Sequence, residues 1–141
     1  MQFYSTNRKT SPVSLREAVV RGLAADRGLF MPEVIRRFPP AFYQNMKEMT
    51  LREISFVVAE AFFGEDVEAG KLKEIVDETL NFDIPLVQVA DNRYSLELFH
   101  GPTLAFKDVG ARFMARFLPP FYKKESFSSI NRRASGRSMC W

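Results

Sequence analysis

The sequence predicts an α/β protein in which a small, mostly helical unit is followed by a β-hairpin and one further helix. Two capping-box patterns each stand before an apolar stretch with helical spacing, which indicates helices in the first part. Residues 85 to 99 alternate between apolar and polar side chains instead, which is typical of strands. With 46% hydrophobic residues and 14 phenylalanines, the 141-residue chain has enough apolar surface for a core.

The first predicted helix covers residues 14 to 23, within "SPVSLREAVVRGL". Ser14 can accept a hydrogen bond from the backbone N–H of Glu17, and the Glu17 side chain can reach back to the Ser14 N–H. A turn follows in "AADRGLFMP", where we expect Gly28 to take a positive φ and Pro32 to end a short apolar segment.

Two more helices complete the first unit, which we place at residues 1 to 81. A second capping box, Thr50 with Glu53, begins a helix through "LREISFVVAEAFFG", and Gly64 is placed to end it. A third helix fits residues 67 to 80, where apolar residues recur with a period close to 3.6.

A second region, residues 82 to 124, begins where the pattern changes. The segments "PLVQVA" and "YSLELF" predict two strands joined by a loop at "DNR", residues 91 to 93. The last helix should run from Thr103, as its cap, to Leu118, before Pro119 and Pro120 prevent continuation. Its apolar stripe would consist of Phe106, Val109, Phe113 and Phe117. Residues 125 to 141 have scattered apolar residues, which predicts an irregular tail.

Composition argues against several classes of protein. The net charge is only +3, and the tail supplies two of these charges through Arg132, Arg133 and Arg137 against Glu125, so nucleic-acid binding has little support. One histidine and one cysteine cannot assemble a metal site by ligand spacing, and Cys140 cannot form an internal disulfide. We also expect no membrane span, because no apolar run approaches about 20 residues, and we expect a cytoplasmic location.

Lys107 is the candidate reactive residue. With Thr103 as cap, it would lie in the first helical turn, near the positive pole and beside Phe106, where a cation is disfavoured. A neutral amine is the form that attacks an aldehyde, so the position permits Schiff-base chemistry. The alternative is an ordinary lysine whose stem covers apolar neighbours while its ammonium reaches water. His100, in the preceding "HGPT" turn, is equally consistent with a hydrogen-bonded turn residue.

The segment "LELFHGPTLAFKDVGARFMA", residues 96 to 115, resembles the part of threonine synthases that carries the pyridoxal phosphate lysine. The segments "YSTN" and "VSLREAVVRGLAADRGLFMP" also resemble the small N-terminal domain of that family, and the resemblance extends over roughly the first 124 residues. It implies a fold type II pyridoxal-phosphate enzyme that converts O-phosphohomoserine and water to threonine and phosphate. Lys107 would hold the cofactor and later carry protons. Phe106 would contact the cofactor, and the pocket for the small-molecule substrate would be formed by His100, Gly101, Thr103 and Asp108.

The chain departs from the family pattern at two places. Asn7 and Arg8 stand where the family usually has a basic residue followed by glycine. The tail "ESFSSINRRASGRSMCW" contains only one glycine, Gly136, so it does not supply the Gly-rich loop expected for the cofactor phosphate. We therefore expect an incomplete threonine synthase, inactive alone, whose tail arises by truncation or by a reading-frame change near Lys124.

Two further expectations follow from that interpretation. Residues 82 to 118 should expose apolar surface, because a parallel α/β sheet needs its later strands to cover both faces. The alternative function is a non-catalytic interaction protein, in which the helical unit or the basic tail binds a partner.

Overall fold

A short antiparallel sheet opens the structure, a computed structural model that describes residues 1–121. Its strands are β1 (Gln2–Ser5), β2 (Val13–Ser14) and β3 (Phe30–Pro32), in the order β2-β1-β3. Phe3 pairs with Val13 on one side and with Pro32 on the other. The sequence predicted only the apolar segment that ends at Pro32, and the sheet as such was not predicted. The predicted tail, residues 125 to 141, lies outside the described residues.

Helix α1 (Leu15–Arg21) begins as predicted but is held differently at its first turn. Ser14 Oγ accepts from the Glu17 N–H at 3.3 Å, which confirms the cap. The Glu17 carboxylate pairs with Arg21 at 2.8 Å, one turn ahead, so the predicted reciprocal half of the capping box is wrong. The last residue of the helix is Arg21, two residues before the predicted end at Leu23, and Gly22, with a φ of 72°, is its C-cap.

The turn after α1 needs a glycine for a reason other than the one predicted. Arg27, with a φ of 67°, takes the left-handed conformation that we expected at Gly28. Gly28 is buried, and a Cβ there would collide with Ser5 Oγ and lie 2.9 Å from the Asn7 backbone nitrogen. Close approach of the first strand to this turn therefore excludes a side chain at residue 28.

Four helical segments fill residues 40–79: α2 (Pro40–Asn45), the 3₁₀ turn η1 (Met46–Glu48), α3 (Leu51–Phe63) and α4 (Ala69–Thr79). The capping box that begins α3 is complete, because Thr50 Oγ1 accepts from the Glu53 N–H at 3.3 Å and the Thr50 N–H donates to Glu53 Oε2 at 2.7 Å. Gly64 is the C-cap, as predicted. Helix α2 was not predicted; it begins with proline at its first position, where no backbone donor is needed.

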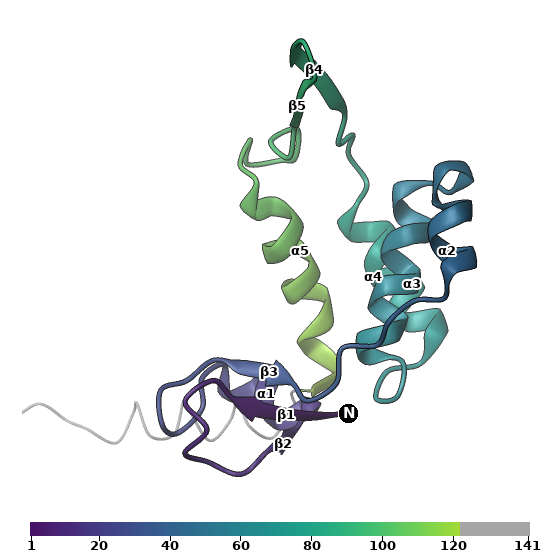
Figure 1. Cartoon of the computed structure of the whole chain (residues 1–141). Coiled ribbons are helices and arrows are strands. Elements are labelled where there is room, and N and C mark those ends of the chain that lie inside the picture. Colours follow the sequence, from purple (N-terminus) through teal and green to yellow (C-terminus); the bar gives the residue numbers. More distant parts are fainter. Residues whose placement is uncertain (122–141) are drawn as a thin grey trace, which may run out of the picture.

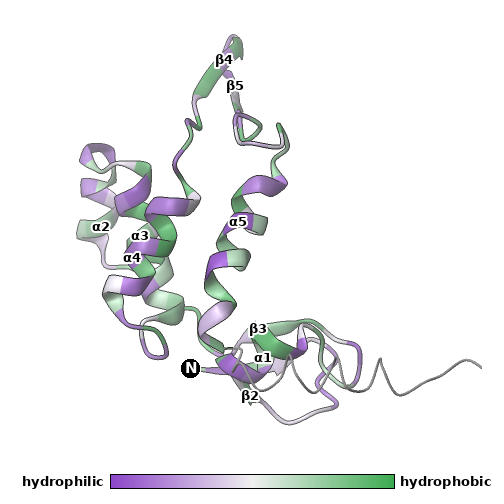
Figure 2. Cartoon of the chain, turned by 180° about the vertical axis from the view of Figure 1, so that it is seen from behind, coloured by the Kyte–Doolittle hydropathy of each residue, from purple (hydrophilic) through white to green (hydrophobic). Residues whose placement is uncertain are grey.

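The predicted hairpin consists of β4 (Leu86–Ala90) and β5 (Arg93–Leu96). Its turn is shorter than expected, since Arg93 already belongs to β5 and Asn92 takes a φ of 55°. Strand β5 ends at Leu96 rather than at Phe99. The hairpin projects away from the helices (Figure 1). The hydropathy colours show apolar residues along it (Figure 2). Exposed apolar side chains include Leu86, Val89, Leu96 and Phe99, which confirms the expected apolar surface.

The core joins the two predicted regions through α5 (Lys107–Phe117) and the 3₁₀ turn η2 (Pro119–Phe121). Its buried members are Phe3, Leu15, Ala18, Leu72, Ile75, Phe117 and Phe121. The Phe117 ring lies 4.6 Å from that of Phe63 on α3. Of the predicted stripe on α5, Phe117 is buried and Val109 and Phe113 are partly buried. Phe106 is 65% exposed, so its place in that stripe is wrong.

Candidate functional site

Lys107 is the first residue of α5 and is exposed. The prediction that this helix begins at Thr103 is wrong, because residues 101–106 form successive turns, with Leu104 at a φ of 55°. The Leu104 N–H donates to the Gly101 carbonyl at 3.0 Å, and the Asp108 N–H donates to the Ala105 carbonyl at 3.0 Å. The side chains of Lys107 and Phe106 both face solvent. Within residues 1–121, no carboxylate forms an ion pair with Lys107.

Asp108 fixes the turn before the lysine. It is 5% exposed, and its carboxylate accepts from the Thr103 N–H at 2.8 Å and from Thr103 Oγ1 at 2.7 Å. Thr103 is therefore not the helix cap that the sequence suggested; it is a donor that the first turn of α5 holds in place. A Cβ at Gly101 would lie 2.9 Å from Asp108 Cβ, so the carboxylate can approach only because residue 101 is glycine.

The hydrogen bonds between Thr103 and Asp108 favour the ionised form of the Asp108 carboxylate. The hydrogen bond from the Thr103 hydroxyl, followed by that from its backbone N–H, holds the pKa of Asp108 below its usual value. Burial acts in the opposite direction, and the Arg112 guanidinium adds a smaller lowering effect. Asp108 thus remains a charged acceptor through the neutral range, and both Thr103 donors are committed to it.

His100 has a local partner. Its Nε2 lies 2.6 Å from Glu97 Oε2, and its ring stacks on Phe99 with centroids 4.8 Å apart. Both His100 and Phe106 are exposed, so neither is enclosed in a pocket by the described residues. Their pocket roles stay predictions. In the described part, no three of the side chains that commonly bind metals come together. No helix there is both long and apolar enough to cross a bilayer.

Sequence reasoning missed Asp26, which organises the segment beginning at Tyr4. Its carboxylate accepts from Ser5 Oγ at 2.6 Å, from the Lys9 N–H at 3.0 Å and from the Gly28 N–H at 3.0 Å. The Ser5 hydrogen bond is the main reason that the pKa of Asp26 is lowered. Beside it, the Arg8 guanidinium lies 4.6 Å from the centre of the Tyr4 ring. An Asp followed closely by Gly was the available signal, but only for a turn.

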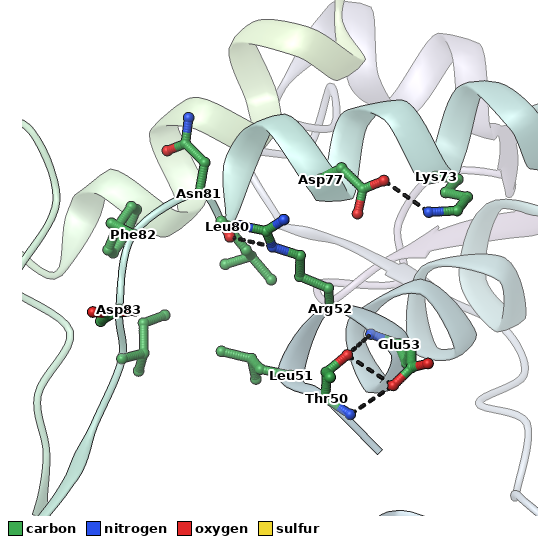
Figure 3. Close-up of a pocket in the computed structure, with 11 residues that line it drawn as sticks. Thr50, Leu51, Arg52, Glu53, Lys73, Asp77, Leu80, Asn81, Phe82 and Asp83 are labelled. Carbon is green, nitrogen blue, oxygen red and sulfur yellow. Dashed lines mark hydrogen bonds and ion pairs between the residues drawn. The ribbon is translucent and has the colours of Figure 1, made fainter.

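A hollow of about 550 Å³ lies elsewhere, between the start of α3, the end of α4 and the linker to the hairpin (Figure 3). Most of its charged side chains form ion pairs or hydrogen bonds with other residues that line the same hollow. Lys73 pairs with Asp77 at 2.8 Å, and Arg52 Nε donates to the Leu80 carbonyl at 2.8 Å. Lys107 is not among its lining residues. We therefore place the candidate site at the turn before α5.

Comparison with known proteins agrees with this architecture. The family model described as threonine synthase N terminus matches residues 2–80. The threonine synthase of Serratia marcescens is 38% identical over 118 residues, and that of Haemophilus influenzae is 40% identical over 118 residues. Each alignment covers 84% of this chain, but only 28% and 27% of those relatives.

Solved structures give the same result. The crystal structure of Escherichia coli threonine synthase superposes with a TM-score of 0.80 and 36% identity, covering 86% of this chain and 28% of that one. A threonine synthase from Brucella melitensis, solved with pyridoxal phosphate bound, gives 0.81 and 32%, covering 86% and 27%. The chain thus spans somewhat more than a quarter of the length of the relatives it matches. From its sequence and its fold alike, this chain belongs to the threonine synthase family.

Proposed function

We propose that this chain is the part of a threonine synthase that carries the cofactor lysine, Lys107. The complete reaction would convert O-phosphohomoserine and water to threonine and phosphate, with pyridoxal phosphate as cofactor, in the cytoplasm. The observation that carries the proposal is the arrangement around Lys107. An exposed lysine without a carboxylate partner in residues 1–121 begins α5, directly after a turn that Asp108 holds rigid.

The residues present fit the attachment of such a cofactor, but Thr103 does not fit the binding of its phosphate. Lys107 offers an exposed primary amine, and Phe106 offers an exposed aromatic ring beside it. The Thr103 N–H and hydroxyl cannot receive a phosphate, because both already donate to Asp108. A carboxylate at the same turn would also repel an anion. The phosphate would therefore be held by groups other than the two Thr103 donors.

Each residue of the site then has a limited task. When bound, pyridoxal phosphate supplies an aldehyde for attachment and a ring that accepts electrons from the substrate carbons. Lys107 supplies the amine that attaches it and a group that can carry a proton. Asp108 and Thr103 tie the turn before Lys107 to the first turn of α5, which fixes the backbone from which the Lys107 side chain extends.

Reductive trapping tests the assignment of Lys107. The 141-residue protein is mixed with limiting pyridoxal phosphate, reduced with borohydride and digested, and the label on each lysine is measured by mass spectrometry. Lys47 and Lys73 are internal controls, since both are exposed and each is paired with a carboxylate. We expect Lys107 to carry more label than either control. Equal labelling would make Lys107 an ordinary surface lysine, as the alternative of an interaction protein requires.

A second test concerns the reaction itself. We expect the 141-residue protein to release no phosphate from O-phosphohomoserine in the presence of pyridoxal phosphate, because it spans only 28% and 27% of the length of the two threonine synthases compared above. Phosphate release above the protein-free blank, lost in Lys107→Ala, would contradict the expected inactivity while supporting the lysine assignment.

A further inference from the structure

Helix α4 ends between two arginines that come from its neighbouring helices. Arg112 of α5 donates through Nη2 to the Glu78 carbonyl at 2.7 Å and to Asn81 Oδ1 at 2.6 Å. Arg52 of α3 donates to the Leu80 carbonyl at 2.8 Å. The last carbonyls of a helix have no partner within it and carry the negative pole of its dipole. Both arginines therefore bind where a cationic donor is most favourable, as Figure 3 shows for Arg52.

One of the two acceptors of Arg112 is a backbone oxygen. Its Nε is buried, and its guanidinium carbon lies 5.6 Å from the centre of the Phe82 ring. Asn81 and Phe82 begin the linker that leads to the hairpin. A single side chain of α5 thus holds the end of α4 and the start of that linker together.

Arg116 provides the contrast on the same helix. Its Nε lies 2.6 Å from the Glu78 carboxylate, and the two side chains are 31% and 53% exposed. An exposed pair between two flexible side chains is weak and is screened by salt. Arg112 instead donates to a backbone oxygen, which has no side-chain rotamers. It therefore constrains the angle between α5 and α4 more strongly than Arg116 does.

Lys107 precedes Arg112 by five residues, or about 7.5 Å along the helix. Phe117, at one end of α5, is buried in the core, whereas Lys107, at the other end, is exposed. We propose that Arg112 is a positioning residue for Lys107: by gripping the end of α4, it sets the direction in which α5 presents the lysine. This inference rests on the proposed role of Lys107, and it assigns Arg112 no contact with cofactor or substrate.

The test measures orientation and lysine labelling separately. Residual dipolar couplings of amides in α4 and α5 report the angle between the two helices, and borohydride trapping reports label on Lys107 relative to Lys47. The variants are Arg112→Met, which removes both hydrogen bonds at the end of α4, and Arg112→Lys, which keeps the positive charge but lacks the guanidinium group. Asn81→Ala removes one of the two acceptors of Arg112 while leaving α5 itself unchanged, so the result does not depend on how well an α5 variant folds. Arg116→Met is the matched control.

In Arg112→Met we expect the equilibrium ratio of the native to other orientations of α5 to fall at least about fivefold, the effect of losing one of its two hydrogen bonds, and the Lys107 label to fall as well. Arg112→Lys and Asn81→Ala should lie between this variant and the wild type, and Arg116→Met should match the wild type. An unchanged angle in Arg112→Met, or an altered angle with unchanged labelling, would overturn the proposal. Absence of preferential labelling in the wild type would instead defeat the role of Lys107, while the angle would still show whether Arg112 orients α5.

Discussion

Replacing Phe117 with alanine should strongly destabilise the protein, because this ring connects the lysine helix to the rest of the core. Phe117 is 2% exposed, and its ring centroid lies 4.6 Å from that of Phe63, 5.4 Å from that of Phe113 and 5.1 Å from that of Phe121. Truncating a buried phenylalanine to alanine costs about 3–5 kcal/mol, through lost burial and the cavity that remains. For a domain with about 5–15 kcal/mol of total stability, that is a large fraction.

Urea unfolding followed by far-UV circular dichroism measures the effect. With a slope near 2 kcal/mol per molar urea, a loss of about 4 kcal/mol lowers the midpoint by about 2 M without changing the slope. Phe106→Ala is the matched control, since Phe106 is 65% exposed and its removal should change stability by no more than about 0.5 kcal/mol. A midpoint shift below about 0.5 M in Phe117→Ala, or equal shifts in the two variants, would refute the reasoning.

Three smaller perturbations test other parts of the structure. Thr50→Ala should lower the free energy of unfolding by about 1 kcal/mol, because it removes the cap of α3; an unchanged urea midpoint would speak against that cap. Gly28→Ala should cost about 1–3 kcal/mol through the collision with Ser5 Oγ, and Ser5→Gly in the same chain should recover part of the loss in melting temperature. The pKa of Asp26 is lower in the folded than in the unfolded chain, so its stabilising contribution is complete above about pH 4 and is lost as the pH falls through the folded value. Asp26→Asn should therefore flatten the acid side of a stability–pH curve, and an unaltered slope would exclude this role.

Helices whose boundaries are marked by their own residues could be predicted from the sequence. The Thr50–Glu53 box and Gly64 are local signals, and the structure uses both of them. The Ser14 cap was also local, but Glu17 had two possible partners within reach and it pairs with Arg21. The sheet could not be predicted in this way, because β2 has only two residues and its pairing depends on β1, about ten residues earlier.

The start of α5 shows why a local rule can fail even with the right residue in place. Threonine before an apolar helical pattern is a common cap, in which the hydroxyl accepts from a backbone N–H. Here the Thr103 hydroxyl donates to Asp108 instead, and Leu104 takes a positive φ, which ends any continuous helix there. A carboxylate five residues away competed for the same side chain. The sequence therefore identified Lys107 as the residue of interest but not the turn that holds it, and the contacts of Asp26 and Arg112 were equally hidden because their partners are distant in sequence.

The change in residue pattern along the sequence and the side-chain packing in the structure divide this chain at different places. The change from helical to alternating residues lies near residues 81 to 85, yet α5, beyond it, packs on the unit before it. Phe113 and Phe117 contact Phe63, and Arg112 reaches the end of α4. In residues 1–121, neither β4 nor β5 contributes a side chain to the two core clusters. The helix that begins with Lys107 is thus held by the N-terminal unit. The hairpin, which lies between them in the sequence, projects away and, among the described residues, adds nothing to the core clusters. A change within α3 or α4 can consequently move Lys107 without touching any residue of the candidate site.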